Sequence, residues 1–597
     1  MCGIVGFISN QEKPELIEKL TSELSHRGPD DQNYEIIRVE DNYIHFGSAR
    51  LSIRDLNDGQ MPMKTSDGSQ LIYNGEIFNF SELKTLHNAT DLKSDTRLIL
   101  EILSNSKSIP TFNGMYAYAY YKSEEEKIYL SRDKFGIKPL YYSHIKEFPL
   151  IFSSELSTFQ NEEFNLKTIT TQDIENYIYF GGFTRYSSPI YGVKKIQPGS
   201  NFIFDISSFT AKVEEYKIKS TPGNDVGPNF KNTFVDVVSD HLDADTSVDI
   251  LLSGGIDSSL LALVTKNELN KNVRTFSLGF DNEKFDESSK SLYISNKLNF
   301  EHEHIIFQQK EINETIEEFL DLTSEPVGDP SIIPSYYLYK NVSKYTKAVL
   351  SGDGADEMFL GYDWHRAAII QENKFIKSIV KNNMLKNLAK IITKNSDEFY
   401  KYYKLLQTID KDIYTQILFW QNINIDEHSQ QLIYEKFIED LNLHKINFYD
   451  GLKILDLTFY LSTNILPKAD IGSMLNGLEV RPPYLDDRIF NYSFNNQVKR
   501  SLLKSFTHSK ADLRDLLAIY TNKKFSKQSK QGFSPNFEYW DKSSALELLR
   551  KYSKDIEIVS KFLKMNKNIN NSYFQTRELW KFYSIFKWIE NRDLEII

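Results

Sequence analysis

Cys2 is the residue of this chain best suited to nucleophilic chemistry, and it is the only cysteine among 597 residues. Removal of Met1 would place the thiol beside its own α-amine. The pKa of that amine, roughly 7.7–8.0, lets a neutral fraction accept the thiol proton. Nucleophile and base would then lie in one residue. The alternative is a buried apolar role, which most free cysteines have, so the choice depends on partners elsewhere in the chain.

Polar residues that follow short apolar runs could hold an amino-acid substrate beside this thiol. The planar guanidinium of Arg50 suits a carboxylate, and Asp95 could hold an ammonium group. The side-chain amide of Asn74 and the N–H of Gly75 could donate to a developing oxyanion. Each residue taken alone has an ordinary structural alternative, namely a surface salt bridge, a turn or a helix cap.

The elements that must position these residues are predicted from the pattern of apolar positions. Helical spacing indicates three helices, at residues 16–24, 80–86 and 95–103, the last capped by Ser94 or Asp95. Short apolar runs bounded by turns predict strands at residues 4–8, 43–46, 70–73, 115–121, 128–130 and 151–152. Strands in long meanders with a few helices suggest two packed sheets flanked by helices.

Six ordered motifs in this region resemble the class II glutamine amidotransferase domain. They are MCGIVG at 1–6, HRGPD at 26–30, ARLSI at 49–53, YNGEI at 73–77, SDT at 94–96 and RDKFGIKPLYY at 132–142. The resemblance implies an α+β N-terminal-nucleophile fold, a four-layer αββα sandwich, over residues 1–215. It also implies release of glutamate and ammonia from glutamine.

The same resemblance assigns roles by motif position. Cys2 would be the nucleophile, and Asn74 with Gly75 would form the oxyanion hole. The residues implied to bind glutamine are Arg50, Glu76 and Asp95, with main-chain contacts from Leu51, Ser52 and Ile53.

A glycine-rich turn in the second half of the chain could bind phosphate. The apolar run 248–252 predicts a buried strand, and SGGIDSS at 253–259 leads into an apolar stretch, 260–264, that starts a helix. Strand, glycine turn and helix N-terminus together form an anion-binding cradle, and Asp257 could hold Mg²⁺. No lysine follows, so this is not the Gly-x-x-x-x-Gly-Lys-Ser/Thr loop. The alternative is a turn rich in serine and glycine with no ligand.

A second glycine turn follows a later strand of the same βα rhythm. Strands are predicted at 275–280 and 348–350, and the latter runs into SGDGADE at 351–357. Its carboxylates, on Asp353, Asp356 and Glu357, would repel one another unless a cation neutralised them. A solvated acidic turn is the alternative.

These runs resemble the synthetase domain of glutamine-hydrolysing asparagine synthetase. Four further motifs add to the resemblance: FDES at 285–288, EP at 325–326, GY at 361–362 and KQGF at 530–533. The first glycine turn resembles the pyrophosphate loop of ATP pyrophosphatases. The resemblance implies an α/β parallel-sheet domain over residues 216–597, with a helical insert at about 365–465. It implies ATP binding by Leu251, Ser253, Gly254, Gly255, Ser258, Leu278, Ser351 and Gly352. Asp257 and Asp356 would hold Mg²⁺-pyrophosphate, Asp353 would lie where the acyl-adenylate forms, and Lys530 would neutralise the α-phosphate.

Two departures from the family pattern concern the acceptor. The chain has Ile471 where members of the family usually have arginine, and Ser331-Ile332-Ile333-Pro334 where some asparagine synthetases have Thr-Thr-Ile-Arg. That second variant also occurs in bacterial relatives that amidate other carboxylates, such as sugar acids of surface polysaccharides. Ile471 leaves a charge missing near the active face, and the Ser331–Pro334 variant questions aspartate as the acceptor more than it questions the chemistry.

Bulk composition is that of an ordinary soluble globular protein, and the length predicts at least two domains. A chain of 597 residues exceeds what one core supports, and a polar stretch at 212–228 predicts the domain boundary, with 220–224 as the linker. The net charge of −11 disfavours nucleic acid as a partner. No membrane span or signal peptide is evident, and with one cysteine there is no internal disulfide, so the cytoplasm is the expected compartment.

The sequence therefore predicts a two-site enzyme that uses ATP and Mg²⁺. Ammonia released from glutamine would pass through an enclosed tunnel to a carboxylate activated as its adenylate, with aspartate as the favoured acceptor. The rivals are an amidotransferase for a sugar acid or another carboxylate, a ring-forming synthetase of the β-lactam type, and a non-catalytic sensor of glutamine or nucleotide. The oligomeric state is left open, with a homodimer as the assembly considered.

Overall fold

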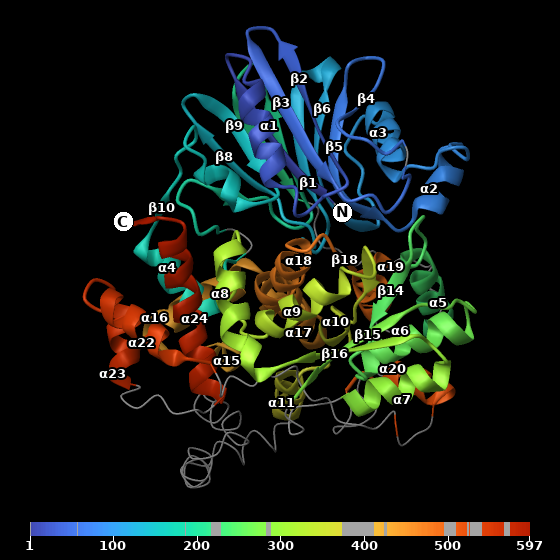
Figure 1. The fold of residues 1–597 in the computed structure, drawn as a ribbon, viewed down its shortest axis with the longest axis vertical. Coiled ribbons are helices and arrows are strands. Elements are labelled where there is room, and N and C mark those ends of the chain that lie inside the picture. Colours follow the sequence, from blue (N-terminus) through green and yellow to red (C-terminus); the bar gives the residue numbers. More distant parts are fainter. Residues whose placement is uncertain are drawn as a thin grey trace.

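The computed structural model divides into two stacked parts, with the N-terminal part uppermost in Figure 1 and the remainder of the chain below it. The structure describes residues 2–56, 58–184, 187–215, 229–281, 288–372, 411–422, 425, 427–494, 509–521, 525, 540–565 and 573–597. The predicted linker at 220–224 lies outside these residues.

Two antiparallel sheets form the upper part. The first has the strand order β11-β8-β9-β1-β3-β2 and the second β13-β12-β7-β6-β5-β4. The first sheet comprises β1 (Cys2–Ser9), β2 (Asp31–Val39), β3 (Asn42–Arg50), β8 (Tyr141–Ile145), β9 (Phe148–Ser153) and β11 (Lys194–Lys195). The second comprises β4 (Met63–Lys64), β5 (Gln70–Ile77), β6 (Gly114–Lys122), β7 (Lys127–Arg132), β12 (Ser200–Asp205) and β13 (Thr210–Glu215).

Strand β1 shows how the sheets and helices are layered, because it is buried on both faces. Ile4 and Ile8 join the core shared by the two sheets, whereas Val5 and Phe7 pack with helix α1 (Pro14–Glu23) on the other face. This two-residue alternation is that of a strand between two apolar layers. Helices α2 (Phe80–Leu86) and α3 (Asp95–Asn105) belong to the second sheet's side, where α3 contacts β5. The predicted αββα sandwich is confirmed.

One local prediction in this part is wrong. The sequence suggests that Asn74, Gly75 and Glu76 follow a strand, but they lie inside β5, whose ladder with β6 continues to the pair Ile77↔Gly114. An Asn-Gly pair is typical of a turn. Here a Cβ on Gly75 would lie 2.1 Å from the carbonyl oxygen of Met115, so glycine allows the neighbouring strand to approach.

A five-stranded parallel sheet organises the lower part, in the order β16-β15-β14-β17-β18. Its strands are β14 (Val248–Leu251), β15 (Thr275–Phe280), β16 (His302–Phe307), β17 (Ala348–Leu350) and β18 (Glu479–Arg481). The predicted strands at 275–280 and 348–350 are confirmed. Strands β14 and β17 are neighbours, so the two glycine turns that follow them leave the same edge of the sheet.

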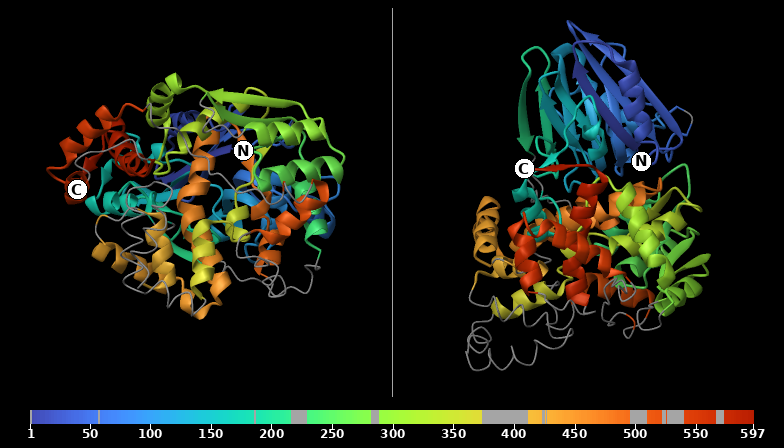
Figure 2. Two further views of the ribbon diagram at one scale, coloured as in Figure 1. Left: turned by 90° about the horizontal axis from the view of Figure 1, so that it is seen from below. Right: turned by 60° about the vertical axis from the view of Figure 1, so that its left-hand side comes forward.

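Helices surround this sheet and extend to the far end of the molecule (Figures 1 and 2). Those near the sheet are α5 (Phe230–His241), α6 (Ile256–Asn267), α7 (Ser288–Leu298), α8 (Ile312–Leu322), α9 (Ile332–Val342), α10 (Ala355–Met358), α19 (Asp487–Phe494) and α20 (Ala511–Tyr520). The region of the predicted insert contains α11 (Asp363–Glu372), α15 (Ile413–Gln421), α16 (Glu427–Asp440) and α17 (Phe448–Asp456). Its stretches at 375–388 and 399–406 lie outside the described residues.

Helix α17 continues through a π-helical segment, Leu457–Ile465, directly into α18 (Leu466–Met474). A π-helix is rare and often marks a functional region. The helix thus runs without a break from Phe448 to Met474.

The C-terminal segment contains α22 (Lys542–Tyr552), α23 (Glu557–Met565) and α24 (Tyr573–Asn591). Trp580 and Trp588 are fully buried, so their expected packing role is confirmed. Strand β19 (Glu595–Ile596) then pairs with β10 (Thr168–Ile169), next to α4 (Thr171–Phe180), and ties this segment to the upper part (Figure 2, right).

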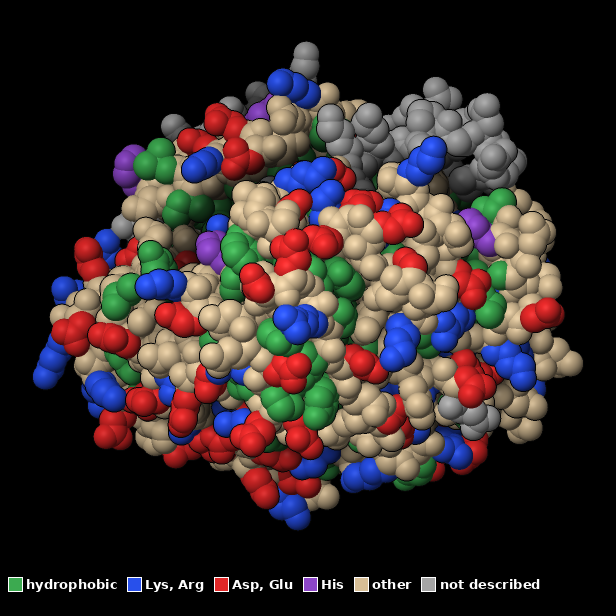
Figure 3. Space-filling view, turned by 90° about the horizontal axis from the view of Figure 1, so that it is seen from above, with side chains coloured by type: hydrophobic (Ala, Val, Ile, Leu, Met, Phe, Trp, Pro, Cys, Tyr) green, Lys and Arg blue, Asp and Glu red, His purple; other side chains and the backbone are tan. Residues whose placement is uncertain are grey.

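The outer face of the upper part carries acidic and basic side chains interspersed with one another (Figure 3). Within the described residues, no helix combines the length and apolar character needed to cross a bilayer.

Candidate functional site

Cys2 begins β1 at the end of the upper part that meets the lower part. It is 6% exposed and lies opposite Arg50 in the β1–β3 ladder. Burial raises the pKa of the Cys2 thiol, and the backbone N–H of Leu51 and the charge of Arg50 oppose that rise. A thiol in this environment needs a nearby base to become a thiolate.

Asn74 provides a buried amide next to Cys2. Its Oδ1 accepts the backbone N–H of Cys2 at 3.0 Å, and its Nδ2 has no hydrogen-bond partner among the described residues. A buried N–H without an acceptor is costly, and such groups are typically kept for a ligand. This donor is therefore suited to a developing oxyanion.

The guanidinium of Arg50 is buried beside the thiol. Its Nη2 donates to the carbonyl oxygens of Asp55 at 2.6 Å and Arg54 at 3.1 Å, which fixes the plane of the group. The residues after it, Leu51–Ile53, are buried in the same wall. The predicted carboxylate anchor and the predicted main-chain contacts therefore lie together.

Asp95 is the first residue of α3 and is buried. Ser94 caps the helix by accepting the N–H of Arg97, so Ser94 is the cap of the two candidates. The Asp95 carboxylate accepts the hydroxyl of Tyr73 at 3.2 Å and the N–H of Thr96 at 2.7 Å. This buried acid could receive an ammonium group.

Glu76 is the second acid and is 3% exposed. Its Oε1 accepts Nε of Arg54 at 2.8 Å, and its Oε2 forms an ion pair with Nη2 of Arg481, from the lower part, at 3.2 Å. Burial raises the pKa of Glu76 to about 7, opposed by Arg481 and assisted by Asp95. The candidate glutamine pocket thus draws on both parts of the molecule.

The first glycine turn folds tightly between β14 and α6. Gly254 has φ +75°, and a Cβ there would lie 2.5 Å from Cβ of Lys290. Gly255 is the residue before α6, and the hydroxyls of Ser253 and Ser258 lie 3.0 Å apart across the turn. Helix α6 points its N-terminus into this loop, which is the arrangement that binds phosphate.

The expected nucleotide contacts lie around the same edge. Leu251 ends β14, and Leu278 lies in the adjacent strand β15. Gly352 lies against the first turn, since a Cβ on it would be 3.0 Å from Cβ of Asp257. The two glycine turns therefore form one site.

Lys510 joins the two predicted metal ligands. Its Nζ lies 2.7 Å from Oδ2 of Asp257 and 2.8 Å from Oδ1 of Asp356, and its side chain is 4% exposed. The two carboxylates therefore converge on one cationic centre. Among the described residues no group of three or more acidic, histidine or cysteine side chains could hold a metal. Mg²⁺ is commonly held by one or two carboxylates with substrate phosphates completing the shell, so the pair fits that ion.

Several predicted residues lie outside the described part of the chain. Lys530 is among them, with the rest of the KQGF motif at 530–533 and residues 285–287 of the FDES motif. The structure gives no position for these side chains.

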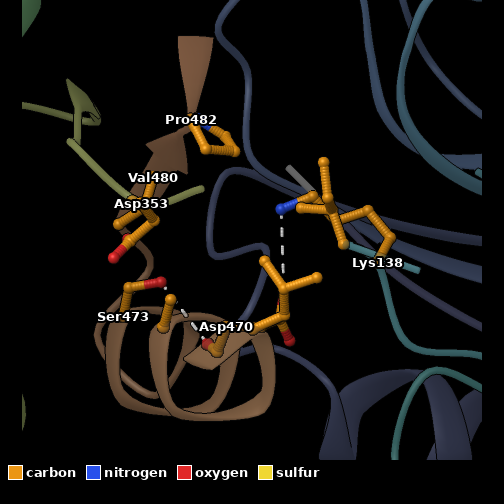
Figure 4. Close-up of a pocket in the computed structure, with 9 residues that line it drawn as sticks. Lys138, Asp353, Asp470, Ser473, Val480 and Pro482 are labelled. Carbon is orange, nitrogen blue, oxygen red and sulfur yellow. Dashed lines mark hydrogen bonds and ion pairs between the residues drawn. The ribbon is translucent and has the colours of Figure 1, made fainter. Parts of the chain in front are cut away.

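A small cavity lies where the upper and lower parts meet (Figure 4). Apolar side chains from both parts line it, together with Lys138, Asp353, Asp470 and Ser473. Lys138 comes from the upper part, and its Nζ lies 3.6 Å from Asp470 of α18. Asp353 belongs to the second glycine turn, so that turn reaches this cavity. Its carboxylate accepts a hydrogen bond from the hydroxyl of Ser351 at 2.8 Å.

Arg27 connects the cavity wall to the thiol site. Its Nη2 donates to both carboxylate oxygens of Asp470, at 2.9 and 3.2 Å, and its Nε donates to the carbonyl oxygen of Cys2 at 3.4 Å. Arg27 is 1% exposed, so this is a buried ionic contact across the interface.

The two departures from the family pattern occupy neighbouring helices. Ile471, in α18, packs against the apolar cluster that contains Ile332 of α9, which leaves no charge at that position. Lys468, one turn earlier, lies 3.5 Å from Asp329 and donates to the hydroxyl of Ser331 at 2.9 Å. Lys468, which contacts Ser331, is therefore already paired.

Three contributors were not predicted: Arg27, Arg481 and Lys510. The triplet Glu479-Val480-Arg481 alternates charge around an apolar residue, and a short buried strand of this kind can signal a buried ion pair. Lys510 stands in no recognisable pattern, and only the folded chain brings it to the two aspartates.

Comparison with family models gives two matches that together span most of the chain. Residues 229–584 match the model described as asparagine synthase, and residues 1–217 match the glutamine amidotransferase domain.

Curated relatives cover nearly the whole chain. The protein from Bacillus subtilis named asparagine synthetase [glutamine-hydrolyzing] 1 is 28% identical over 92% of this chain and 89% of its own length. The Methanocaldococcus jannaschii protein named putative asparagine synthetase [glutamine-hydrolyzing] 2 is 29% identical over 80% of this chain and 98% of its own. A solved structure titled as the allosteric regulatory enzyme of purine biosynthesis covers 51% of this chain and 65% of its own, at 12% identity; its TM-score of 0.28 is too low to support a comparison.

Proposed function

The chain belongs to the asparagine synthase family, and from this premise we propose that it is a glutamine-dependent ligase that uses ATP to convert a carboxylate into an amide. Aspartate is the expected acceptor, with asparagine, AMP, pyrophosphate and glutamate as products. The family match supports ATP as the co-substrate, and the amidotransferase match supports glutamine as the nitrogen donor.

In the first half-reaction the Cys2 thiol attacks the side-chain amide carbon of glutamine. Once Met1 is removed, the α-amine of Cys2 takes the thiol proton and passes it to the departing ammonia. The oxyanion accepts hydrogen bonds from Nδ2 of Asn74 and the N–H of Gly75. Water then hydrolyses the thioester to glutamate. The buried, unpartnered Nδ2 of Asn74 supports this assignment.

In the second half-reaction the acceptor carboxylate attacks the α-phosphate of ATP, releases pyrophosphate and becomes an acyl-adenylate. Ammonia then attacks the acyl carbon and displaces AMP. The two glycine turns would hold the phosphates with backbone N–H groups. Asp257 and Asp356 would hold Mg²⁺, which neutralises the pyrophosphate charge when bound. Lys510, now between these acids, would turn toward the phosphates, and Lys530 is proposed to act on the α-phosphate.

The observation that carries the proposal is the buried connection between the two sites. Arg27 contacts both Cys2 and Asp470, and Asp470 lines a cavity together with Asp353. Ammonia released at the thiol could travel along this interface without meeting solvent acid. Enclosure replaces a bimolecular capture by a local one, which can be worth several kcal/mol.

A different acceptor is the second candidate, and one observation favours it. Ile332 and Ile333 are buried in α9, and Lys468 is engaged by Asp329 and Ser331. Among the described residues, the cation that contacts this stretch, Lys468, is thus already engaged and is not free for the second carboxylate of aspartate. A sugar acid or another carboxylate would not require one.

The test is to incubate the enzyme with glutamine, ATP-Mg²⁺ and a panel of acids, and to measure pyrophosphate and the amide product. Pyrophosphate release that depends on aspartate supports asparagine synthesis. Release with a uronic acid but not aspartate supports the second candidate. No acid-dependent pyrophosphate from any member of the panel would contradict the ligase, and the β-lactam type and sensor alternatives would then be reconsidered.

A further inference from the structure

We infer that Arg481, a residue of the lower part, is a positioning residue for glutamine: it holds the Glu76 carboxylate in place for the substrate's ammonium group. This rests on the proposed function, because it assumes that glutamine occupies the pocket beside Cys2.

The two carboxylate oxygens of Glu76 are held from opposite parts of the molecule. Arg54 of the upper part donates to Oε1, and Arg481 lies on Oε2. Arg54 alone would leave the carboxylate free to rotate about its last bond, whereas cations on both oxygens fix its plane. Its orientation therefore depends on Arg481.

Arg481 is itself fixed before any ligand arrives. Its Nε donates to Oε1 of Glu479 at 2.5 Å, and its Nη1 donates to the carbonyl oxygens of His241 at 2.9 Å and Asp243 at 3.2 Å. Asp243 also accepts Nη2 of Arg54 through its backbone oxygen at 2.7 Å. The end of α5 thus anchors both arginines that hold Glu76.

The charge around Glu76 makes Arg481 important for ionisation as well as for orientation. Asp95, Glu479 and Tyr73 lie within electrostatic reach, and Arg54 and Arg481 are the cations that face it. The carboxylate is buried, and its pKa already stands at about 7. Removal of Arg481 would favour the neutral acid further, and a neutral acid binds an ammonium group poorly.

The backbone of Arg481 reaches the nucleotide site. Arg481 pairs with Leu350 in the β17–β18 ladder, and its carbonyl oxygen accepts the N–H of Ser351 at 2.9 Å. Ser351 opens the second glycine turn. A side-chain substitution keeps these backbone bonds, so a defect in the glutamine pocket can be separated from a defect in the nucleotide turn.

The experiment uses the full-length chain with Arg481→Met and Arg481→Lys. Glutamate release from glutamine without ATP measures the first pocket, and ammonia-dependent pyrophosphate release with the acceptor measures the second. For Arg481→Met we expect the KM for glutamine to rise tenfold or more with kcat within about threefold. The loss in kcat/KM for glutamine should exceed any loss in the ammonia-dependent reaction at least fivefold. Arg481→Lys keeps the charge, so its KM for glutamine should lie between that of the wild type and that of Arg481→Met.

Arg488→Met is the matched control, because Arg488 pairs with Asp240 of the same helix α5 and with Asp486 but does not contact Glu76. It should leave the KM for glutamine within twofold. Equal losses in both reactions, or an unchanged KM in Arg481→Met, would overturn the inference. If Arg481→Met does not fold, Arg481→Lys decides: a KM raised threefold or more supports the role, and an unchanged KM refutes it. Failure of the wild-type enzyme to release glutamate would instead refute the proposed function.

Discussion

At the scale of single residues, the buried thiol of Cys2 needs help to ionise. Burial raises its pKa, so few molecules would carry a thiolate at neutral pH without a base. The proposed base is the α-amine of the same residue, whose nitrogen donates to Asn74 at 3.0 Å. Cys2 is proposed as the nucleophile and Asn74 as the oxyanion donor, and one substitution at each residue tests its role.

Cys2→Ala should abolish glutamine-dependent amide formation and leave ammonia-dependent formation active. The reason is that the second site needs only ammonia, whereas the first needs the sulfur nucleophile. The measurement is pyrophosphate release with each nitrogen source, alongside glutamate release. Residual glutaminase activity in Cys2→Ala would show that another group attacks glutamine.

Asn74→Ala should lower kcat for glutamine hydrolysis by roughly 10²–10³-fold, the usual loss when one oxyanion donor is removed. The KM should change less, because the donor acts mainly on charge that develops in the transition state. Steady-state glutamate release gives both parameters. A rise in KM with kcat preserved would mean that Asn74 binds the ground state instead.

Lys510→Met should make the protein depend on Mg²⁺ for stability. Without the lysine, the carboxylates of Asp257 and Asp356 would be left close together and unneutralised. We expect a lower melting temperature in EDTA, and a larger rise on adding Mg²⁺ than the wild type shows. Lys347→Met is the control, because its ion pair with Asp30 is at the surface. Equal Mg²⁺ responses in variant and wild type would contradict the convergence of the two acids on a metal.

At the scale of elements, the two adjacent glycines in the turn after β14 differ in how much space each has for a side chain. Gly254 has a positive φ and no space for a Cβ, whereas a Cβ on Gly255 would meet only the hydroxyl of Ser253, at 3.3 Å. The turn needs glycine at the first position for its shape. At the second position the backbone conformation would accept a side chain, since Gly255 has φ −69°.

Gly254→Ala should therefore disrupt the turn and weaken ATP binding tenfold or more, because the left-handed conformation and the contact with Lys290 both disfavour a side chain. Gly255→Ala is its matched control for stability and should leave the melting temperature within about 2 °C. Calorimetry of ATP binding and thermal unfolding measure the two effects. Equal melting temperatures for the two variants would show that the turn is not constrained as described.

Element boundaries also show what the sequence could predict. The helix at 95–103 and the strands at 275–280 and 348–350 follow from their apolar patterns, since each is largely buried, and the helix at 80–86 follows from helical spacing although Phe80 is its one buried residue. The sequence did not predict that the strand continues through Asn74 and Gly75, because an Asn-Gly pair is typical of turns. Only the close approach of Met115 in the neighbouring strand explains a glycine there.

At the scale of the whole molecule, buried ion pairs cross the interface between the upper and lower parts. Burial alone would raise the pKa of Glu155, but His26 and Arg27 lower it to about 2. Arg27 also pairs with Asp470 of the lower part. The ionised Glu155 therefore helps to hold Arg27 at the interface.

Low pH should lower the free energy of unfolding, because the Glu155 carboxylate becomes protonated. Because the folded pKa of Glu155 lies below its ordinary value of 4.5, its contribution is complete above about pH 4.5 and is lost as the pH falls toward 2. The contribution is on the order of 3 kcal/mol. The difference in unfolding midpoint between wild type and Glu155→Gln should be largest near pH 5–6 and shrink by pH 3. A difference that is constant with pH would exclude this linkage.

The candidate site was predictable where its residues lie in contiguous motifs and was not predictable where distant segments meet. Cys2, Arg50, Asn74 and Asp95 converge in the structure, as their motifs imply. Arg481 and Lys510 reach their distant partners through pairing of β18 and the packing of α20, and no local sequence pattern shows that Arg481 meets Glu76 or that Lys510 meets the two aspartates. Lys530 remains a prediction.

The π-helical segment Leu457–Ile465 has an evolutionary consequence. An α-helix advances about 100° per residue, and a widened turn accommodates extra residues that an α-helical path would not. If the same residues followed an α-helical path, the segment would turn further and α18 would present a different face to the upper part. Asp470 would then turn away from Arg27 and Lys138. A homologue in which this segment is a regular α-helix should therefore be shorter here or lack the acid at position 470.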